Sequence, residues 1–156
     1  MMSRHVRVLG SLVAGVLLGA CSAARDITSF EPLVGAAPVA VDLQRAADVP
    51  LSGLPRLNIS ATAGEVSAVW EVEGGSCIIA SASASRAGSV IEIKLERGGN
   101  PLANCVAGRV GYRYIARVGG LEQGEYEVRV VDVFAGQPAY EVGRRSVVVG
   151  AIIVFD

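Results

Sequence analysis

The sequence predicts an all-β protein, built as an antiparallel β-sandwich of about seven to eight short strands. Apolar and polar residues alternate in several segments, most regularly in residues 91–96, and this period of two is typical of a strand with one buried face. Turn-forming residues, mainly glycine, proline, asparagine and aspartate, separate these segments at intervals of about 8 to 15 residues. No segment beyond residue 20 has the periodicity of an amphipathic helix, so we expect two packed sheets.

The N-terminal segment has the order of a secretory signal. Arg4 and Arg7 lie in its first seven residues, and a largely apolar run follows in residues 8–20. At about a dozen residues, this run is shorter than the ~20 that a membrane-spanning helix needs. We therefore expect residues 1–20 to be a signal peptide that is removed.

The end of this run, Leu18-Gly19-Ala20-Cys21, resembles the lipobox of bacterial lipoproteins. The resemblance implies cleavage before Cys21 and lipidation of this cysteine with two or three acyl chains. Such a protein stays on its membrane, because each buried methylene contributes about 0.8 kcal/mol. Ser22 stands where an aspartate would retain a lipoprotein in the inner membrane, which favours the outer membrane and leaves its periplasmic or surface face open. The alternative is an ordinary signal cleaved beside a chance cysteine.

Two regions follow the signal. Residues 21–36 show no sustained period and are interpreted as a tether, which as a coil would have a root-mean-square span of about 20 Å. Residues 37–156 have the length of one domain and are expected to form the sandwich. The domain would therefore meet only partners close to its membrane.

Composition argues against several functions. The chain has 14 Lys and Arg and 15 Asp and Glu; Arg4 and Arg7 leave with the signal, so 12 cations and 15 acids remain, a net charge of −3. This mild acidity argues against a nucleic-acid partner. The single histidine, His5, also leaves, and with it the commonest general base and metal ligand. Since no nucleotide-binding glycine motif is present either, we expect no enzyme, no cofactor and no metal site.

The remaining catalytic possibility is a pair of carboxylates. Glu71 with Glu73 and Glu125 with Glu127 are spaced i, i+2, which places both members on one face of a strand. This spacing is more typical of the solvent face of a half-buried strand than of a hydrolase site. The same interpretation, a solvated face rather than an interface, applies to a charged strip formed by Arg113, Arg117, Glu125 and Glu127.

The first expected strands lie in residues 39–43, 54–60 and 66–73. In the third of these, the apolar residues occupy alternate positions, and the single tryptophan, Trp70, is among them. Because it shares the apolar phase, Trp70 is expected to be a core anchor. The alternative is an exposed platform for a ligand.

Two cysteines bracket the next pair of strands. Residues 78–85 alternate in size rather than polarity, so their buried face stays open, whereas residues 91–96 alternate clearly. With Cys21 assigned to lipid, Cys77 and Cys105 form an even pair, and an oxidising compartment favours a disulfide between them. Closing a loop of about 29 residues should stabilise the domain by about 3 to 4 kcal/mol.

The strongest signal of fold lies in residues 110–133, where alternation continues on both sides of a turn. Leu121, Gly124 and Tyr126 resemble the corner of fibronectin type III and related immunoglobulin-like domains. The resemblance implies an immunoglobulin-like or fibronectin III-like sandwich in which the hydroxyl of Tyr126 bonds back to the upstream backbone. An up-and-down barrel is the alternative fold.

The connection at this turn has two possible geometries. In a hairpin, Arg117 would lie opposite Glu127 in one ladder. In an arch, the two strands belong to different sheets and make no ladder. The corner motif favours the arch.

The last strand is expected in residues 140–149, followed by an apolar run that contains Ile152, Ile153, Val154 and Phe155. Uncharged β-formers at an exposed edge invite pairing with another chain. We expect this run to be buried between the sheets. If it is exposed, it becomes the best candidate for a partner-binding surface.

The function that the sequence favours is that of a non-catalytic accessory lipoprotein of the cell envelope. It would be held on the membrane through Cys21 and would bind another envelope protein through sheet edges or loops. A glycan-binding lipoprotein is the alternative, and it would require aromatic residues such as Trp70 and Tyr140 together on an open face. A carboxylate-only hydrolase ranks third, since it would need a cleft with two acids of raised pKa.

Overall fold

The computed structural model describes residues 30–100, 103–105 and 108–150. Cys21 and the run that contains Ile152, Ile153, Val154 and Phe155 lie outside the described residues, so their predicted roles stay predictions. Within the described ranges no helix is formed, and none is therefore long and apolar enough to cross a membrane.

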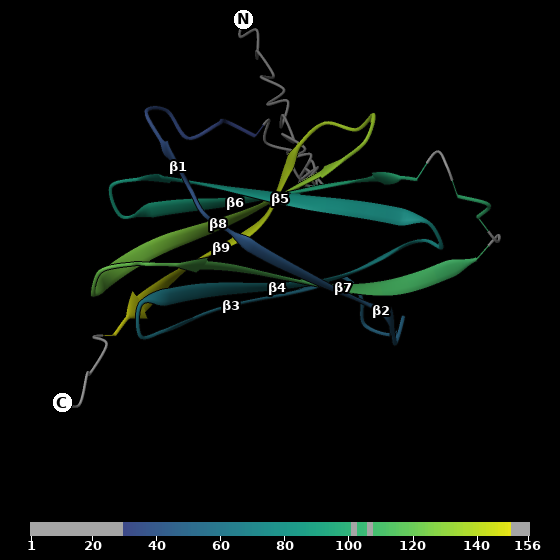
Figure 1. The fold of residues 1–156 in the computed structure, drawn as a ribbon, viewed down its shortest axis with the longest axis horizontal. Coiled ribbons are helices and arrows are strands. Elements are labelled where there is room, and N and C mark those ends of the chain that lie inside the picture. Colours follow the sequence, from purple (N-terminus) through teal and green to yellow (C-terminus); the bar gives the residue numbers. More distant parts are fainter. Residues whose placement is uncertain (1–29, 101–102, 106–107, 151–156) are drawn as a thin grey trace, which may run out of the picture.

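The described part of the chain forms nine strands in two layers (Figure 1). They are β1 (Ala37–Val39), β2 (Asp42–Val49), β3 (Arg56–Thr62), β4 (Glu65–Gly75), β5 (Ile78–Ala87), β6 (Val90–Gly99), β7 (Arg109–Gly119), β8 (Gly124–Phe134) and β9 (Tyr140–Val149). The sheet of five strands has the order β1-β5-β6-β8-β9, and the sheet of four strands has the order β2-β7-β4-β3. The predicted all-β sandwich is confirmed.

One strand more than the predicted maximum is present, and the N-terminal strand differs from the expectation. The segment predicted as a single strand in residues 39–43 is divided between β1 in the five-stranded sheet and β2 in the four-stranded sheet. The chain crosses at Ala40 and Val41, and Val39, Val41 and Leu43 all pack against the core. The alternation therefore continues through the crossing, with Ala40 and Asp42 exposed, although the chain changes sheets there.

The ladders are mostly antiparallel. Of the seven ladders between described strands, six are antiparallel and one, β6 with β8, is parallel. Immunoglobulin-like domains have antiparallel sheets, so this central parallel pair is a departure from their scheme.

The turn between β7 and β8 is an arch. β7 pairs with β2 and β4, whereas β8 pairs with β6 and β9 in the other sheet. Arg117 accordingly lies opposite Asp42 and Ser67 rather than opposite Glu127. The hydroxyl of Tyr126 donates to the backbone carbonyl of Glu122, 3.1 Å away.

The core follows the alternation of the strands. On β4, Val66, Ala68 and Trp70 are buried, and Trp70 is only 5% exposed, which confirms that it is a core residue. On β6, the buried apolar set is Ile91, Ile93 and Leu95. On β5, whose buried face the sequence left open, Ile78 and Ala84 face the core and Ile79 faces outward with 50% of its surface exposed.

A buried ion pair lies at one end of this core. Arg97 of β6 donates from Nε and Nη2 to the two carboxylate oxygens of Asp132 on β8, over 2.9 and 2.5 Å. The side chain of Arg97 is 6% exposed and that of Asp132 is fully buried. The hydroxyl of Tyr140 donates to the same carboxylate over 3.0 Å, and burial beside this negative charge raises the pKa of Tyr140 to about 12. Both charges are thus satisfied inside the sandwich.

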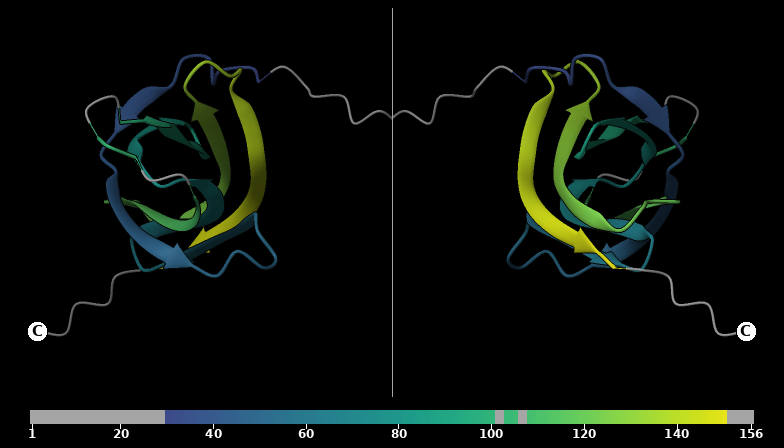
Figure 2. Two further views of the ribbon diagram at one scale, coloured as in Figure 1. Left: turned by 90° about the vertical axis from the view of Figure 1, so that its right-hand side faces the viewer. Right: turned by 90° about the vertical axis from the view of Figure 1, so that its left-hand side faces the viewer.

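The two sides of the sandwich are closed differently. On one side, β9 curves from the five-stranded sheet towards β3 (Figure 2), Arg145 donates from Nη1 to the carbonyl of Ile59 over 3.2 Å, and Gly150 forms a parallel bridge with Ala63. On the other side, the described residues form no ladder between β5 and β2, and Arg45 of β2 reaches across to donate to the carbonyl of Ile78. The fold is therefore barrel-like on the β9 side and open on the β5 side.

The predicted disulfide is formed between Cys77 and Cys105, whose Cα atoms are 5.5 Å apart and which are separated by 28 residues. It joins the residue that precedes β5 to the segment between β6 and β7. The start of β5 is therefore covalently fixed.

Removal of the buried carboxylate should be costly. Asp132→Ala leaves the guanidinium of Arg97 buried without its counter-charge, and we expect the free energy of unfolding to fall by about 3 to 5 kcal/mol. The matched control is Glu96→Ala, which removes an exposed partner of Lys94 on the same sheet and should change it by less than about 1 kcal/mol. Urea unfolding followed by tryptophan fluorescence measures both; equal effects would show that the buried pair has no special role.

Loss of the disulfide should also be measurable. The double variant Cys77→Ala and Cys105→Ala is expected to unfold at lower urea concentration, with a loss of about 3 to 4 kcal/mol for a loop of this length. Reducing agent should shift the native protein towards the variant and leave the variant itself unchanged. A native protein that does not respond to reduction under unfolding conditions would contradict this expectation.

Candidate functional site

The open side of the sandwich exposes an edge of β5. β1 is only three residues long, and its ladder covers β5 at Ala84, Ser85 and Arg86. Over residues 78–83 of β5, no described strand pairs with the side that faces away from β6. We call residues 78–83 the β5 edge.

The backbone groups of the β5 edge alternate in direction. The carbonyl of Cys77 accepts from the amide of Asn100 over 2.8 Å, on the side of β6, whereas the carbonyl of Ile78 points away from β6 and accepts from Arg45. Because N–H and C=O groups of successive strand residues point to opposite sides, those of Ala80 and Ala82 also point away from β6. Ala80 and Ala82 therefore present main-chain donors and acceptors on the open side.

Nothing in the side chains of the β5 edge blocks the approach of another strand. Natural proteins protect edges with lysine, proline or bulges. Residues 78–83 read Ile-Ile-Ala-Ser-Ala-Ser, with no charge and no proline. Arg45 contacts the edge at its Ile78 end, where its guanidinium also lies over the ring of Tyr112, 5.6 Å from its centre, and Lys94 of β6 lies opposite Ser83.

A hollow adjoins the β5 edge on the outer face of the five-stranded sheet. It has a volume of about 470 Å³ and is lined mainly by small and apolar residues, among them Ile79, Ser81, Gly98, Gly99 and Val133. Gly98 has no side chain to fill the hollow; an added Cβ at this position would lie 3.2 Å from the Cβ of Ala135, which also lines it. The hollow can take an apolar side chain from a strand added beside Ile79.

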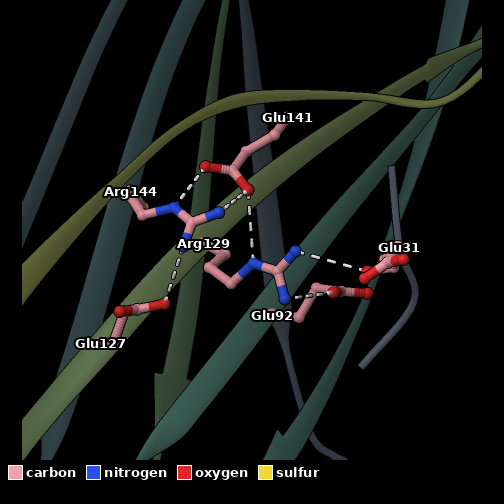
Figure 3. A network of polar contacts seen from close by, with 6 residues as sticks. All are labelled: Glu31, Glu92, Glu127, Arg129, Glu141 and Arg144. Carbon is pink, nitrogen blue, oxygen red and sulfur yellow. Dashed lines mark hydrogen bonds and ion pairs between the residues drawn. The ribbon is translucent and has the colours of Figure 1, made fainter. Parts of the chain in front are cut away.

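A charged network occupies the same outer face further along the sheet (Figure 3). Arg144 of β9 donates two hydrogen bonds of 2.6 Å to Glu141 and lies 3.4 Å from Glu127. Arg129 of β8 lies 3.4 Å from Glu141 and 3.9 Å from Glu92. The hydrogen bonds from Arg144, more than any other contact, lower the pKa of Glu141.

Residues assigned to the tether bind to this network. Arg129 lies over the ring of Phe30, 5.8 Å from its centre, and donates from Nη2 to the carbonyl of Glu31 over 3.4 Å. Glu92 accepts a hydrogen bond from the backbone amide of Leu33. Glu92 is 7% exposed, and its burial raises its pKa above the ordinary value despite the nearby Arg129. The chain is thus held against the sheet before β1 begins.

The predicted carboxylate pairs are paired with arginines or lie at the surface. On the outer face of the four-stranded sheet, Glu71 accepts from Arg113 over 2.6 Å and lies 3.7 Å from Arg56, and Glu73 pairs with Arg109. Glu127 belongs to the Arg144 network, and Glu125 is exposed. In the described residues, no three His, Cys, Asp or Glu side chains gather in a way that could hold a metal.

The charged strip predicted from the sequence does not form one surface. Arg113 and Arg117 lie on β7, in the four-stranded sheet, whereas Glu125 and Glu127 lie on β8, in the five-stranded sheet. The arch separates them. Arg117 instead lies 3.6 Å from Asp42 and 3.9 Å from Glu65.

The aromatic residues considered for a glycan site are also apart. Trp70 is buried in the core on β4, and Tyr140 on β9 is 39% exposed with its hydroxyl bound to Asp132. They do not form a shared open platform.

Sequence reasoning did not find the β5 edge. Its exposure depends on where β1 ends, and nothing in residues 78–83 themselves reports the length of another strand. The one local signal is the run of small residues, which lacks the charges of a protected edge.

Comparison with models of known protein families, with curated proteins and with solved structures finds no match for this chain.

The raised pKa of Glu92 predicts a pH-dependent effect on stability. A carboxyl whose pKa is higher in the folded than in the unfolded state contributes stability that is present at low pH and lost as the pH rises through its folded pKa. Glu92→Gln keeps an acceptor for Leu33 without the charge, so we expect this variant to unfold at higher urea concentration than the native protein at pH 7. The two should converge below about pH 4.

The matched control is Glu96→Gln, on the same strand but exposed. It should show no comparable gain at pH 7. A Glu92→Gln protein that is less stable than the native one at both pH values would contradict the expectation.

Proposed function

We propose that this protein is a non-catalytic lipoprotein of the cell envelope that binds another envelope protein by adding one of its strands to the β5 edge. The observation that carries the proposal is the unpaired stretch of β5, where Ala80 and Ala82 present free main-chain groups beside an apolar hollow. An exposed edge of this kind is a template for strand addition.

The membrane location is supported by the lipobox at Cys21. Phe30 follows Cys21 by nine residues, a distance of at most about 30 Å for a fully extended chain. Because Phe30, Glu31 and Leu33 contact the outer face of the five-stranded sheet, only the residues before them separate the domain from its anchor. Partners would be met close to the bilayer, and the outer membrane is the location that Ser22 favours.

The energetics of strand addition fit this edge. Main-chain hydrogen bonds to Ala80 and Ala82 would supply affinity without selecting a sequence. Selectivity would come from the side chain that enters the hollow beside Ile79, because a buried apolar anchor dominates the energy of an interface. Much of the charge on both outer faces is already paired, as for Glu71 and Glu141, which leaves the edge as the less polar surface for recognition.

A non-catalytic role is supported by the side chains that are present. The sequence beyond residue 20 contains no histidine, and the acids considered for catalysis are mostly engaged by arginines. The glycan alternative finds no favourable observation, since Trp70 is part of the core.

A substitution that removes a free donor tests the proposal. Ala82→Pro deletes an N–H that points away from β6, so the ladder with β6 keeps its bonds, and the matched control Ala82→Ser keeps the N–H. In-cell crosslinking of the lipidated protein, followed by detergent extraction and mass spectrometry, should identify a discrete envelope protein. Its yield should fall by about tenfold in Ala82→Pro and stay unchanged in Ala82→Ser.

Cys21→Ala provides the second control, because loss of the anchor should reduce the same crosslink. An equal yield from Ala82→Pro and Ala82→Ser would exclude the β5 edge as the binding surface. If no discrete protein crosslinks to the native chain, the interaction role itself fails.

A further inference from the structure

We infer that the strand received by the β5 edge is the segment that follows β9 in a second copy of this chain, with Ile152 to Phe155 as its core. The inference rests on the proposed function, since it names the partner of the same edge. It joins two features, an uncharged β-forming run after Gly150 and an open edge of similar length on β5.

The donor and the acceptor cannot belong to one molecule. The ladders fix the positions of these residues along the strands. Val149 pairs with Gly124 on β8. Three residues further along β8, Glu127 pairs with Ser146 and Val90, and Val90 pairs with Ala87. Ala82 is therefore displaced from Val149 by about eight residues along the strands, or about 27 Å, with β6 and β8 in between. The three residues from Val149 to Ile152 span at most about 11 Å. A second copy must supply the segment.

The direction of the added strand follows from β1. β1 is antiparallel to β5, and its ladder ends at Val39 opposite Ala84. An incoming strand that continues this row would place Ile152 opposite Ala82 and Val154 opposite Ala80. Since these alanines face the core side of β5, Ile152 and Val154 would cover apolar surface that the short β1 leaves partly exposed.

The same register places the last apolar residue of the run at the hollow. Phe155 would lie opposite Ile79, whose side chain is half exposed on the outer face and lines the hollow with Gly98 and Val133. A phenyl ring fits an apolar hollow of this kind. The largest side chain of the run, Phe155, would thus enter the hollow beside Ile79.

Charge complementarity supports this direction. In the antiparallel arrangement, Asp156 would lie beside Ile78, where the guanidinium of Arg45 contacts the edge. A parallel strand would carry Asp156 away from Arg45, towards the Ala84 end of β5. There the neighbouring cation is Lys94 of β6, opposite Ser83, which already pairs with Glu96 over 2.6 Å. The antiparallel register instead places the one acid of the segment beside Arg45, which contacts the main chain of the edge.

This contact is heterologous, because each molecule donates the segment that follows β9 and accepts the same segment of another copy at its β5 edge. Such contacts build rows unless their rotation closes a ring. With every copy held on a membrane, the rows would extend in the plane of the bilayer.

The test uses the full-length lipidated protein, extracted in detergent and reconstituted in vesicles as a mixture of ¹⁵N-labelled and unlabelled copies. Phe155 is replaced by the photo-crosslinker p-benzoylphenylalanine. We expect crosslinks that join a labelled copy to an unlabelled one, between position 155 and the peptide that contains Ile79. Their yield should fall by about tenfold in Ala82→Pro and persist in Ala82→Ser.

A second pair of variants keeps the test independent of how Ala82→Pro folds. Val154→Lys puts a charge where the inference needs an apolar contact, and it should abolish the crosslink between copies. Val148→Lys changes a β9 valine that is 70% exposed and should leave the crosslink intact. Crosslinks found only within single copies, or equal yields for the two lysine variants, would overturn the inference.

The outcome for the proposed function is separate. If the β5 edge still captures a different envelope protein in cells while no crosslink joins two copies, the proposed function stands and the self-partner is wrong. If the edge captures neither, both fail.

Discussion

The early crossing of the chain from one sheet to the other is the constraint on which the open edge depends. β1 leaves the five-stranded sheet after Val39, because Val41 and Leu43 pack into the core and Asp42 pairs with Arg117 on β7. This pairing uses the chain that could otherwise have continued along β5. The four-stranded sheet thus gains β2 as an edge strand, and the five-stranded sheet keeps an unpaired stretch at residues 78–83.

The fold could be predicted largely from local alternation, but the site could not. Residues 66–73, 91–96 and 110–133 reveal their buried faces, because each strand was long and polar enough on one side to show the period of two. The disulfide followed from the even number of cysteines left after Cys21. Strand partners are set by long-range pairing, so the parallel neighbour relation of β6 and β8 had no local signature.

Buried polar residues were equally hidden from sequence. Arg97 occupies the next alternate position after Ile91, Ile93 and Leu95 and is buried like them. Its charge, however, would predict that the buried face of the strand ends at Leu95. Asp132 is fully buried only because Arg97 and Tyr140 reach it from neighbouring strands. A residue that depends on partners from two other strands cannot be placed by a pattern within its own.

Arginine sets the character of both outer faces. Its planar guanidinium binds two acids at once, as Arg144 does with Glu141 and Glu127, and it covers the glutamates that it neutralises, as Arg113 covers Glu71. Many charges on these faces are consequently paired, so a protein partner gains little by displacing the existing contacts. The edge carries no such competing pairs, which makes it the surface where added contacts bring the largest net gain.

The position of the disulfide determines when the β5 edge becomes fixed. Cys77 immediately precedes Ile78, so the bond to Cys105 fixes the first residue of the stretch that would accept a strand. Disulfides form and persist in oxidising compartments and are rare in the reducing cytosol. In the proposed envelope location, a newly made chain would thus lack a firmly positioned acceptor until export, and the proposed strand addition between copies would be disfavoured before the disulfide forms.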